Sequence, residues 1–296
     1  MDGILCLDKP QEMTSFRLCA IARRLTGEKK AGHAGTLDPM ATGVLPILLG
    51  RATRALDLLP SHDKRYLATV QLGVVSDSLD IWGRVTPTNE PLPAADAVEA
   101  ALGAFRGEIL QVPPMLSALK KDGVRLYDLA REGVEVERTP RPVTIYALEL
   151  LSYDAAKGEA ILDVTCSKGT YIRTLADDLG RALGCGAVMA GLRRVAASVF
   201  SIEDCLTVEQ ATAFAEEGTL AAHILPTEAV FALYPAARIS EAQAKRFRNG
   251  GQLDLIRIPW AGGTVPDGYV RVYAPDGAFV GLGLPKDGVL TIAYLA

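Results

Sequence analysis

Apolar and β-branched residues recur at the spacing of strands in several short stretches of this chain. Residues 64–73 are rich in β-branched and aromatic residues, with Tyr, Thr and Val among them, while 160–166 and the shorter run 3–7 are mostly apolar. Residues 138–145 lead into another expected strand. Asp-Gly pairs, which favour tight turns, separate three more strands that we expect near the C-terminus, at 269–273, 278–282 and 289–294.

Apolar positions at helical spacing predict helices between these strands. Thr14 or Ser15 is suited to cap the first of them. Its apolar side would consist of Phe16, Cys19, Ala20 and Leu25. Further helices are expected at residues 45–59, 94–105 and 241–247, and from about residues 170 and 207 onward.

Composition narrows the class of protein. Hydrophobic residues make up 49% of the chain and charged residues 22%, as in ordinary globular proteins. There is no run of about 18 apolar residues and no signal-peptide pattern after Met1, so we expect no membrane span and a cytoplasmic location. The five cysteines and three histidines are widely spaced, which predicts neither a disulfide framework nor a metal site.

The charged residues are unevenly distributed. A net charge of −4 argues mildly against nucleic-acid binding, because most nucleic-acid-binding domains are basic. However, the five basic residues of 17–30 are accompanied by one acid, Glu28, and four more occur at Arg51, Arg54, Lys64 and Arg65. The sequence therefore predicts a locally basic face that could bind phosphates, with an ordinary solvated surface as the alternative.

The segment 30–43 has the composition of a loop with a fixed path, because it holds three glycines and Pro39. It also contains one imidazole, His33, and one carboxylate, Asp38. Pro39 disfavours the helical conformation at the residue before it, so the Asp38 carboxylate should be held in place. Such an acid is suited to act as a nucleophile on an anionic substrate. The alternative is a structural turn in which Asp38 caps a helix from about Met40.

A longer pattern surrounds this loop. It reads G-H-x-G-T-L-D-P from Gly32 to Pro39, continues through Leu45-Pro46, and ends with G-R-A-T-R at 50–54. The pattern closely resembles the signature of the TruB family of tRNA pseudouridine synthases. The resemblance implies that Asp38 is the catalytic nucleophile and that His33 helps to displace and replace the flipped uridine. It also places Gly35 and Thr36 at the substrate.

Other segments extend the resemblance and imply further site residues. The family's D-K-P-x-x-x-T-S pattern contains Lys9, with Glu12 close to where a glycine is usual. The K-x-Y-x-A pattern contains Lys64 and Tyr66, the latter implied to stack on the target base and assist catalysis rather than to pack in the core. C-S-K-G-T-Y-I-R contains Tyr171 and Arg173, the implied partner of Asp38.

Two more matches complete the set of implied substrate contacts. Leu192 begins the family's L-R-R, where the leucine lines the uracil pocket. Lys120 belongs to a Q-x-P-P-x-x-S-A-x-K segment that resembles the family's mobile thumb, expected at about 112–140. Asp77 and Asp80 resemble an acidic pair of the family, and we interpret them as acceptors that organise a loop rather than as metal ligands.

The resemblance implies an α/β (α+β) fold, with a mixed, largely antiparallel central sheet flanked by helices and a small C-terminal PUA-like β domain. We expect a catalytic domain at residues 1–230 and an RNA-binding domain at 231–296. A generic stabilising β module is the alternative for the second. The implied reaction converts uridine 55 in the T loop of tRNA to pseudouridine, with no cofactor and no metal. We expect tRNA as the partner and a monomeric enzyme.

Two alternatives to this function stay open. One is a pseudouridine synthase of another RNA specificity, such as the related guide-RNA-dependent enzymes, although the thumb-like segment argues for a self-contained enzyme. The other is a tRNA-folding chaperone that uses the same site. An intact Asp38 does not exclude the chaperone, because RNA folding and catalysis can coexist in one protein.

Overall fold

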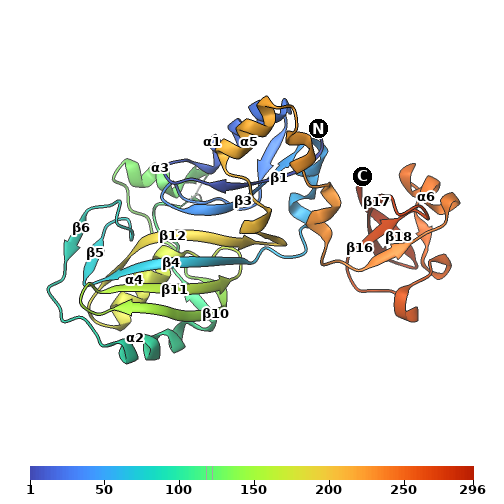
Figure 1. Cartoon of the computed structure of the whole chain (residues 1–296). Helices are drawn as coiled ribbons and strands as arrows, with labels where there is room; N and C mark the ends of the chain where they lie inside the picture. Colours follow the sequence, from blue (N-terminus) through green and yellow to red (C-terminus); the bar gives the residue numbers. More distant parts are fainter. Residues whose placement is uncertain (118, 122) are drawn as a thin grey trace.

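The computed structural model describes residues 1–117, 119–121 and 123–296. Its larger part is a mixed sheet with helices on both faces (Figure 1). The strands of this sheet and of two attached hairpins are β1 (Gly3–Lys9), β2 (Ala31–His33), β3 (Thr42–Leu49), β4 (Lys64–Leu72), β5 (Val74–Ser76), β6 (Val85–Pro87), β7 (Gly107–Gln111), β8 (Lys120–Lys121), β9 (Val124–Arg125), β10 (Arg141–Asp154), β11 (Glu159–Cys166), β12 (Ala187–Ala197) and β13 (Phe200–Ser201). The helices are α1 (Ser15–Thr26), α2 (Ala95–Leu102), α3 (Leu126–Arg131), α4 (Ile172–Ala182) and α5 (Val208–Glu216).

The central sheet has the order β1-β3-β12-β4-β11-β10-β7, with β2 added to β3 and β13 to β12, among the described residues. All of these pairs are antiparallel except β3 with β12, which run parallel over a short stretch where Gly43 lies opposite Arg194. The expected mixed, largely antiparallel sheet is confirmed. The parallel contact brings the end of the 30–43 loop against β12, and this junction later positions the site.

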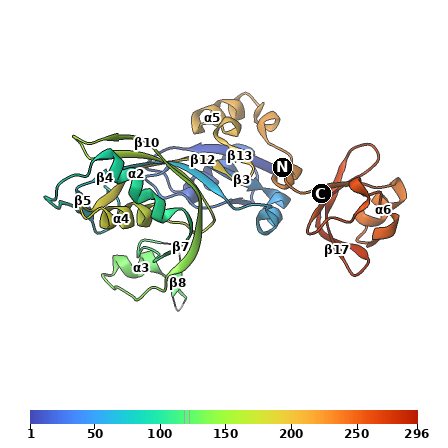
Figure 2. The ribbon, with the colours of Figure 1, turned by 90° about the horizontal axis from the view of Figure 1, so that it is seen from below.

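Helices cover the sheet on both sides. Figure 2 shows α2 and α4 on one face, with α3 and the β8 strand beyond them, and α5 on the other. Thr14 caps α1 as expected, because its side chain accepts a hydrogen bond from the Arg17 backbone N–H at 3.1 Å. The expected apolar side of α1 was wrong at Phe16, whose side chain is 74% exposed, while Leu18 is buried with Cys19.

The prediction of a helix at 45–59 was wrong in its first half. Residues up to Leu49 belong to β3, and the helical part is a 3₁₀ helix at Gly50–Leu58. Side chains of β3 are buried on both faces of the sheet: Leu45 and Ile47 pack beside α1, while Val44 and Leu48 pack in another cluster. A strand buried on both faces is apolar throughout, so periodicity alone does not separate it from a helix.

The C-terminal part forms a second, small sheet. Its elements are β14 (Ala236–Arg238), α6 (Glu241–Arg248), β15 (Leu253–Asp254), β16 (Val270–Tyr273), β17 (Phe279–Lys286) and β18 (Val289–Leu295). Figure 1 shows this module at one end of the molecule. Leu282 and Tyr294 of the module share a buried cluster with Ile4 and Phe231, which joins the two parts.

Most other expected elements are confirmed within one to three residues at their ends, except that β17 extends four residues beyond the expected end at 282. They are the strands β1, β4, β11 and β16 to β18, and the helices α2, α5 and α6. The division into domains at residues 230 and 231 stays a prediction. None of the helices in the described part of the chain has the length and apolar character that crossing a lipid bilayer requires.

Candidate active site

Asp38 lies in the loop between β2 and β3, and buried polar groups hold that loop from below. The Ser15 hydroxyl at the start of α1 donates to the Leu37 carbonyl at 3.0 Å and accepts from the Leu37 N–H at 2.9 Å. Both residues are buried. The backbone just before Asp38 is therefore fixed to α1, in agreement with the expectation of a held carboxylate. No helix begins at Met40 in this described segment, so the alternative of a helix cap is wrong.

Lys9, at the end of β1, is fully buried beside the same loop. Its ammonium donates to the carbonyls of Pro10 at 2.8 Å, Met13 at 2.7 Å and Pro39 at 3.3 Å. Burial lowers the pKa of Lys9 to about 8, although the Asp38 carboxylate opposes the shift. An ammonium with three backbone partners and no exposed surface favours a role in positioning the loop, and the expected substrate contact of Lys9 stays a prediction.

Arg194 of β12 holds the other side of the loop and is also fully buried. Its guanidinium donates to the carbonyls of Val44 at 2.7 Å, Gly35 at 3.0 Å and Thr36 at 3.5 Å. Gly43 makes this close approach possible, because its φ is +105° and an added Cβ would lie 2.8 Å from the Arg194 backbone nitrogen. The loop is thus pinned to β1, α1 and β12.

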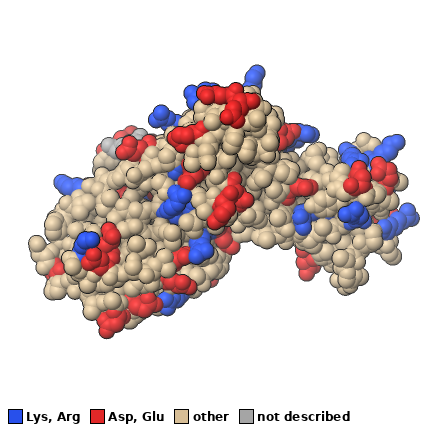
Figure 3. All heavy atoms as spheres, viewed as in Figure 1, with Lys and Arg blue, Asp and Glu red and all other residues tan. Residues whose placement is uncertain are grey.

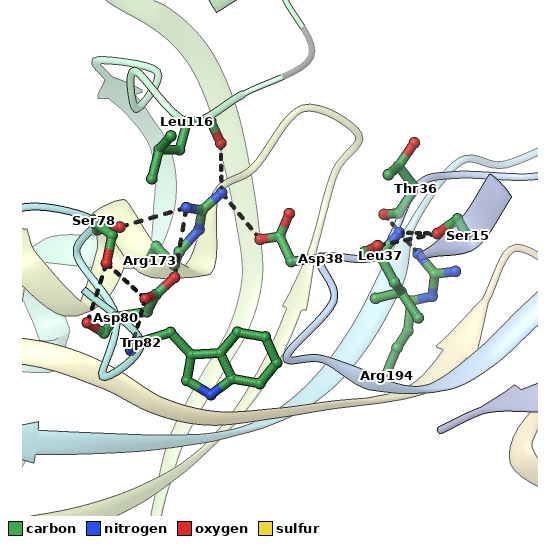
Figure 4. Close-up of polar contacts among 10 residues, drawn as sticks. All are labelled: Ser15, Thr36, Leu37, Asp38, Ser78, Asp80, Trp82, Leu116, Arg173 and Arg194. Carbon is green, nitrogen blue, oxygen red and sulfur yellow. Dashed lines mark hydrogen bonds and ion pairs between the residues drawn. The ribbon is translucent and has the colours of Figure 1, made fainter. Parts of the chain in front are cut away.

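Arg173, in the first turn of α4, contacts Asp38 from the opposite side (Figure 4). Its Nη2 lies 3.0 Å from Asp38 Oδ2 and donates to the Leu116 carbonyl at 2.8 Å. Its Nη1 lies 3.6 Å from Asp80 Oδ2 and donates to the Ser78 carbonyl at 3.4 Å. The Arg173 side chain is 6% exposed, so the pairing expected for it is present in a desolvated setting.

Asp38 and Arg173 line a cavity of about 500 Å³. This is the size of pockets that hold drug-sized ligands, and it exceeds what one pyrimidine ring requires. The cavity is lined by the 38–40 loop, the 77–83 loop, Arg173 and the thumb-like segment, through Asp38, Pro39, Met40, Asp77, Ser78, Asp80, Trp82, Gly83, Met115, Leu116, Ala130 and Arg173.

Two opposing effects set the protonation of Asp38. Burial raises the pKa of its carboxyl above the ordinary value of 3.8, and the neighbouring Arg173 guanidinium opposes the rise. The Asp80 carboxylate adds to the rise, while Lys9 opposes it. Arg173 favours the charged form, as the sequence suggested, but desolvation outweighs it in this structure.

The 77–83 loop is organised by its two acids. Asp80 accepts hydrogen bonds from the Ser78 hydroxyl at 2.7 Å and from the Trp82 N–H at 3.1 Å. Asp77 accepts from the Arg84 N–H at 2.9 Å. The interpretation of both acids as loop-organising acceptors is confirmed, and Asp80 has a further role because it also faces Arg173.

Tyr66 of β4 lies in the core rather than at the cavity surface. It is 7% exposed and packs in the cluster that contains Leu37 and Met40. Burial raises the pKa of its hydroxyl, and the adjacent Arg194 guanidinium opposes the rise. The described residues that line the Asp38 cavity do not include Tyr66. Its position beneath the loop agrees with the packing alternative, and its catalytic part stays a prediction.

His33, Gly35 and Lys64 belong to a second, smaller cavity of about 200 Å³ on another side of the loop. His62 lines it too, and the Lys64 ammonium donates to the His62 carbonyl. The Nδ1 atom of His33 is buried without a hydrogen-bond partner among the described residues. The sequence grouped His33 with Asp38, whereas the structure places them in different cavities.

The chain matches family models over almost its whole length. Residues 23–172 match the TruB family pseudouridylate synthase (N terminal domain), 173–232 the tRNA pseudouridylate synthase B C-terminal domain, and 235–291 the C-terminal domain of pseudouridine synthase II TruB. The chain belongs to the TruB family of pseudouridylate synthases. It is 43% identical to tRNA pseudouridine synthase B of Burkholderia mallei (strain NCTC 10247), covering 98% of this chain and 95% of the relative. It is 42% identical to the protein of that name from Dehalococcoides mccartyi (strain CBDB1), covering 97% and 93%.

Solved structures share the fold at lower identity. One is an H/ACA RNP bound to a substrate RNA containing 2′-deoxyuridine, with a TM-score of 0.75 and 25% identity, covering 99% of this chain and 84% of that chain. Another is the archaeal box H/ACA sRNP Nop10-Cbf5 complex, with a TM-score of 0.73 and 26% identity, covering 99% and 85%. The pseudouridine synthase fold expected from the TruB signature is therefore confirmed.

The remaining residues implied by the TruB patterns are not among the described residues that line the two cavities. Thr36 is exposed on the loop. Tyr171 directly precedes α4, and its backbone exchanges hydrogen bonds at 3.0 and 3.2 Å with the buried side chain of Gln111. Leu192 packs partly buried against the same core cluster as Tyr66, and is not among the described residues that line either cavity. The side chain of Lys120 lies outside the described part of the thumb-like segment.

The expected basic face is less uniform than the sequence suggests. Arg51 pairs with Asp2 at 2.7 Å and Arg65 with Asp163 at 2.6 Å, so two of the basic residues have acidic partners. Figure 3 shows acidic and basic side chains interspersed on the face it presents.

Sequence reasoning missed the groups that fix the loop from below. Ser15 was considered only as a helix cap, and Arg194 only as part of L-R-R. Neither carries a local signal for burial, because each is buried by segments distant in sequence. The Leu116 carbonyl, which reaches Arg173 from the thumb-like segment, was missed for the same reason.

Proposed function

We propose that this TruB-family protein converts uridine 55 in the T loop of tRNA to pseudouridine, with Asp38 as the nucleophile. The observation that carries the proposal is the ion pair between Asp38 Oδ2 and Arg173 Nη2, 3.0 Å apart at the wall of the 500 Å³ cavity. Asp38 stands on a loop that buried groups hold in place, and Arg173 stands in α4. The curated relatives are called tRNA pseudouridine synthase B, which supports tRNA as the substrate.

The reaction breaks the bond between C1′ of the ribose and N1 of the uracil, turns the base, and joins C5 to C1′. N1 gains a proton and C5 loses one, so the product is an isomer and the step needs no redox cofactor. The base must leave the stack to present these atoms, which is least costly in a loop of RNA. Asp38 must be ionised to act as a nucleophile, and Arg173 favours that form and fixes its orientation.

The other implied residues have roles that rest on their motifs. Tyr66 would assist proton transfer at the uracil from the floor beneath the loop, and His33 would support the displaced nucleotide from the second cavity. Lys64, which lines that cavity, and the exposed Lys168, whose charge acts on His62 of the same cavity, would bind RNA phosphates. We further propose that the 112–140 segment and the C-terminal module, residues 231–296, contact the T arm, and that the protein acts as a monomer in the cytoplasm, where tRNA is modified.

The test uses the purified full chain and a synthetic RNA with the sequence of a tRNA T arm, without guide RNA or partner protein. Pseudouridine formation at position 55 is measured alongside the Asp38→Asn variant, which keeps the shape of the side chain. Formation by the parent and none by the variant supports the proposal. Binding without formation by the parent would indicate a chaperone, and formation only with added guide RNA would indicate the other specificity.

A further inference from the structure

Trp82 is a large aromatic side chain at the rim of the Asp38 cavity, and the proposed mechanism does not use it. It is 49% exposed and lines the same cavity as Asp38 and Arg173. Figure 4 shows its indole ring projecting from the 77–83 loop toward the side of the cavity where Asp38 lies. Among the described residues, no aromatic ring stacks on this indole, and about half of the residue's surface is exposed.

The backbone on both sides of Trp82 is held firmly. The Trp82 N–H donates to Asp80 at 3.1 Å, and the preceding Ile81 N–H donates to the Met189 carbonyl of β12 at 3.1 Å. Gly83 follows, at a place where an added Cβ would overlap the side chains of Ser76, Asp77 and Ser78. The indole is thus presented on a fixed loop, which reduces the entropy lost when a ligand packs against it.

The loop that presents Trp82 is also coupled to the catalytic pair. Asp80 accepts the Trp82 N–H through Oδ1, while its Oδ2 faces Arg173 at 3.6 Å. Arg173 in turn contacts Asp38. A group that packs on the indole is therefore placed at a fixed position relative to the proposed nucleophile, the Asp38 carboxylate.

The shape of the cavity indicates which part of the RNA meets Trp82. Its volume of about 500 Å³ leaves room beyond a single pyrimidine. Asp38 and the buried Arg173 form the wall that the target uridine must reach, whereas the half-exposed indole is at the rim. The base at the rim is therefore a neighbour of the target uridine along the chain. Met115 and Leu116 line the cavity too and add an apolar surface.

We propose that Trp82 stacks on the base of a nucleotide adjacent to the target uridine and so positions the flipped uridine against Asp38. This inference rests on the proposed function of the same site. Stacking suits any base because every base has a π face, so Trp82 would be a positioning residue rather than a reader of sequence.

The first experiment measures stacking directly by fluorescence. The chain has two tryptophans, and Trp260 donates its indole N–H to the Leu255 carbonyl at 2.9 Å within the small module. A Trp260→Phe variant, checked for an unchanged melting temperature, leaves Trp82 as the only tryptophan. Titration with T-arm RNA is expected to quench its fluorescence. Two further RNAs lack the base on the 5′ or the 3′ side of the target, and a third lacks the target base.

One of the two neighbour-abasic RNAs is expected to bind without the quench, while the target-abasic RNA keeps it. Quenching that survives both neighbour deletions, or that is lost only with the target base, would overturn the assignment. Absence of quenching on RNA that binds and reacts would do so too. If the RNA neither binds nor reacts, the proposed function itself fails, and this outcome is distinct from failure of the stacking.

The second experiment measures the energetic contribution. Trp82→Ala is expected to weaken T-arm RNA binding by about 5- to 150-fold, as for loss of a stacked base, and Trp82→Phe to retain most of the affinity. Ile81→Ala is the matched control, because Ile81 is 42% exposed on the same loop but does not line the described cavity. Its affinity should stay within about twofold of the parent. On the neighbour-abasic RNA that loses the quench, Trp82→Ala should bind as tightly as the parent. If Trp82→Ala binds that RNA as much more weakly than the parent as it binds the intact RNA, stacking of Trp82 on that base is refuted.

Discussion

Substitution of Lys9 by Met distinguishes two possible roles of this lysine, contact with the RNA substrate and support of the Asp38 loop. From the sequence alone Lys9 is a substrate contact, whereas in the structure its ammonium is fully buried on backbone carbonyls beside Asp38. Met keeps the length and apolar stem of the side chain and removes only the charged donor. We expect a less stable protein with a slower reaction and an unchanged electrostatic component of RNA binding.

The magnitude follows from the bonds that are lost. The carbonyls of Pro10 and Met13 lose their short bonds from Lys9, whereas the Pro39 carbonyl keeps a second donor, the Glu12 N–H at 2.9 Å. A buried carbonyl left without a partner costs about 1–3 kcal/mol, and the relief of desolvating an ammonium offsets part of that cost. We therefore expect a net loss of about 1–3 kcal/mol, seen as a melting temperature lower by several degrees.

Activity should fall because the loop before and after Asp38 is less tightly held. Misplacement of a reacting group by about 1 Å costs roughly 10²-fold in rate, so a partial loosening should slow single-turnover isomerisation by about 10- to 100-fold. Affinity for T-arm RNA at fixed salt should change little.

The decisive assay is the slope of log affinity against log salt. Each phosphate contact contributes about 0.7 to 0.9 to that slope, because neutralising a phosphate releases counterions. Lys9→Met should leave the slope unchanged, and Lys168→Met, at an exposed position, is the matched control that should lower it. A slope that falls for Lys9→Met by the value of one contact, with an unchanged melting temperature, would refute the positioning role.

The remaining predictions concern the cavity and the loop. Asp38→Asn should abolish single-turnover isomerisation and leave RNA binding nearly intact, so turnover above a few per cent of the parent rate would contradict the nucleophile. The rate of the parent should fall with decreasing pH through a pKa above 3.8, because burial disfavours ionised Asp38; Asp80→Asn should move that limb to lower pH, since it removes a charge that raises the pKa. Tyr66→Phe should bind RNA as the parent does and slow isomerisation by about 10²-fold if the hydroxyl moves a proton, whereas full activity would leave it a core residue. Gly43→Ala should destabilise the protein by about 3 kcal/mol or more, because its Cβ would overlap the Arg194 backbone, and an unchanged melting temperature would count against that close approach.

Local pattern predicted those elements whose two faces differ. The strand β4 alternates buried and partly buried positions over most of its length, and the sequence predicted the strand from its β-branched and aromatic residues. The strand β3 is buried on both faces, so its apolar run shows no alternation that would mark it as a strand. The prediction of a helix over these residues was therefore wrong. Phe16 was placed inside for its apolar character, yet α1 turns Leu18 and Ala22 inward and leaves Phe16 in solvent.

The sequence likewise predicted some features of the candidate site and not others. The pairing of Asp38 with Arg173 was predicted because both residues stand in motifs that imply it, although they are far apart in sequence. Burial of Lys9 and Arg194 was not predicted, because exposure of a cation is set by segments that fold over it from elsewhere. The segments that cover Lys9 include the turn after Asp38. Those that cover Arg194 supply the carbonyls of residues 35, 36 and 44. A lysine and an arginine in a motif of an RNA enzyme are otherwise indistinguishable from phosphate ligands.

One of the two buried cations also bears on the chemistry of Asp38, because burial pushes this carboxyl toward its neutral form. Lys9 lies beneath the Asp38 loop, holds its carbonyls and opposes the rise in the pKa of Asp38. Arg194 holds the other side through Gly35 and Thr36. Lys9 therefore helps to position the carboxylate and at the same time favours its charged form, which a nucleophile requires, whereas the Ser15 hydroxyl and Arg194 fix the backbone of the loop.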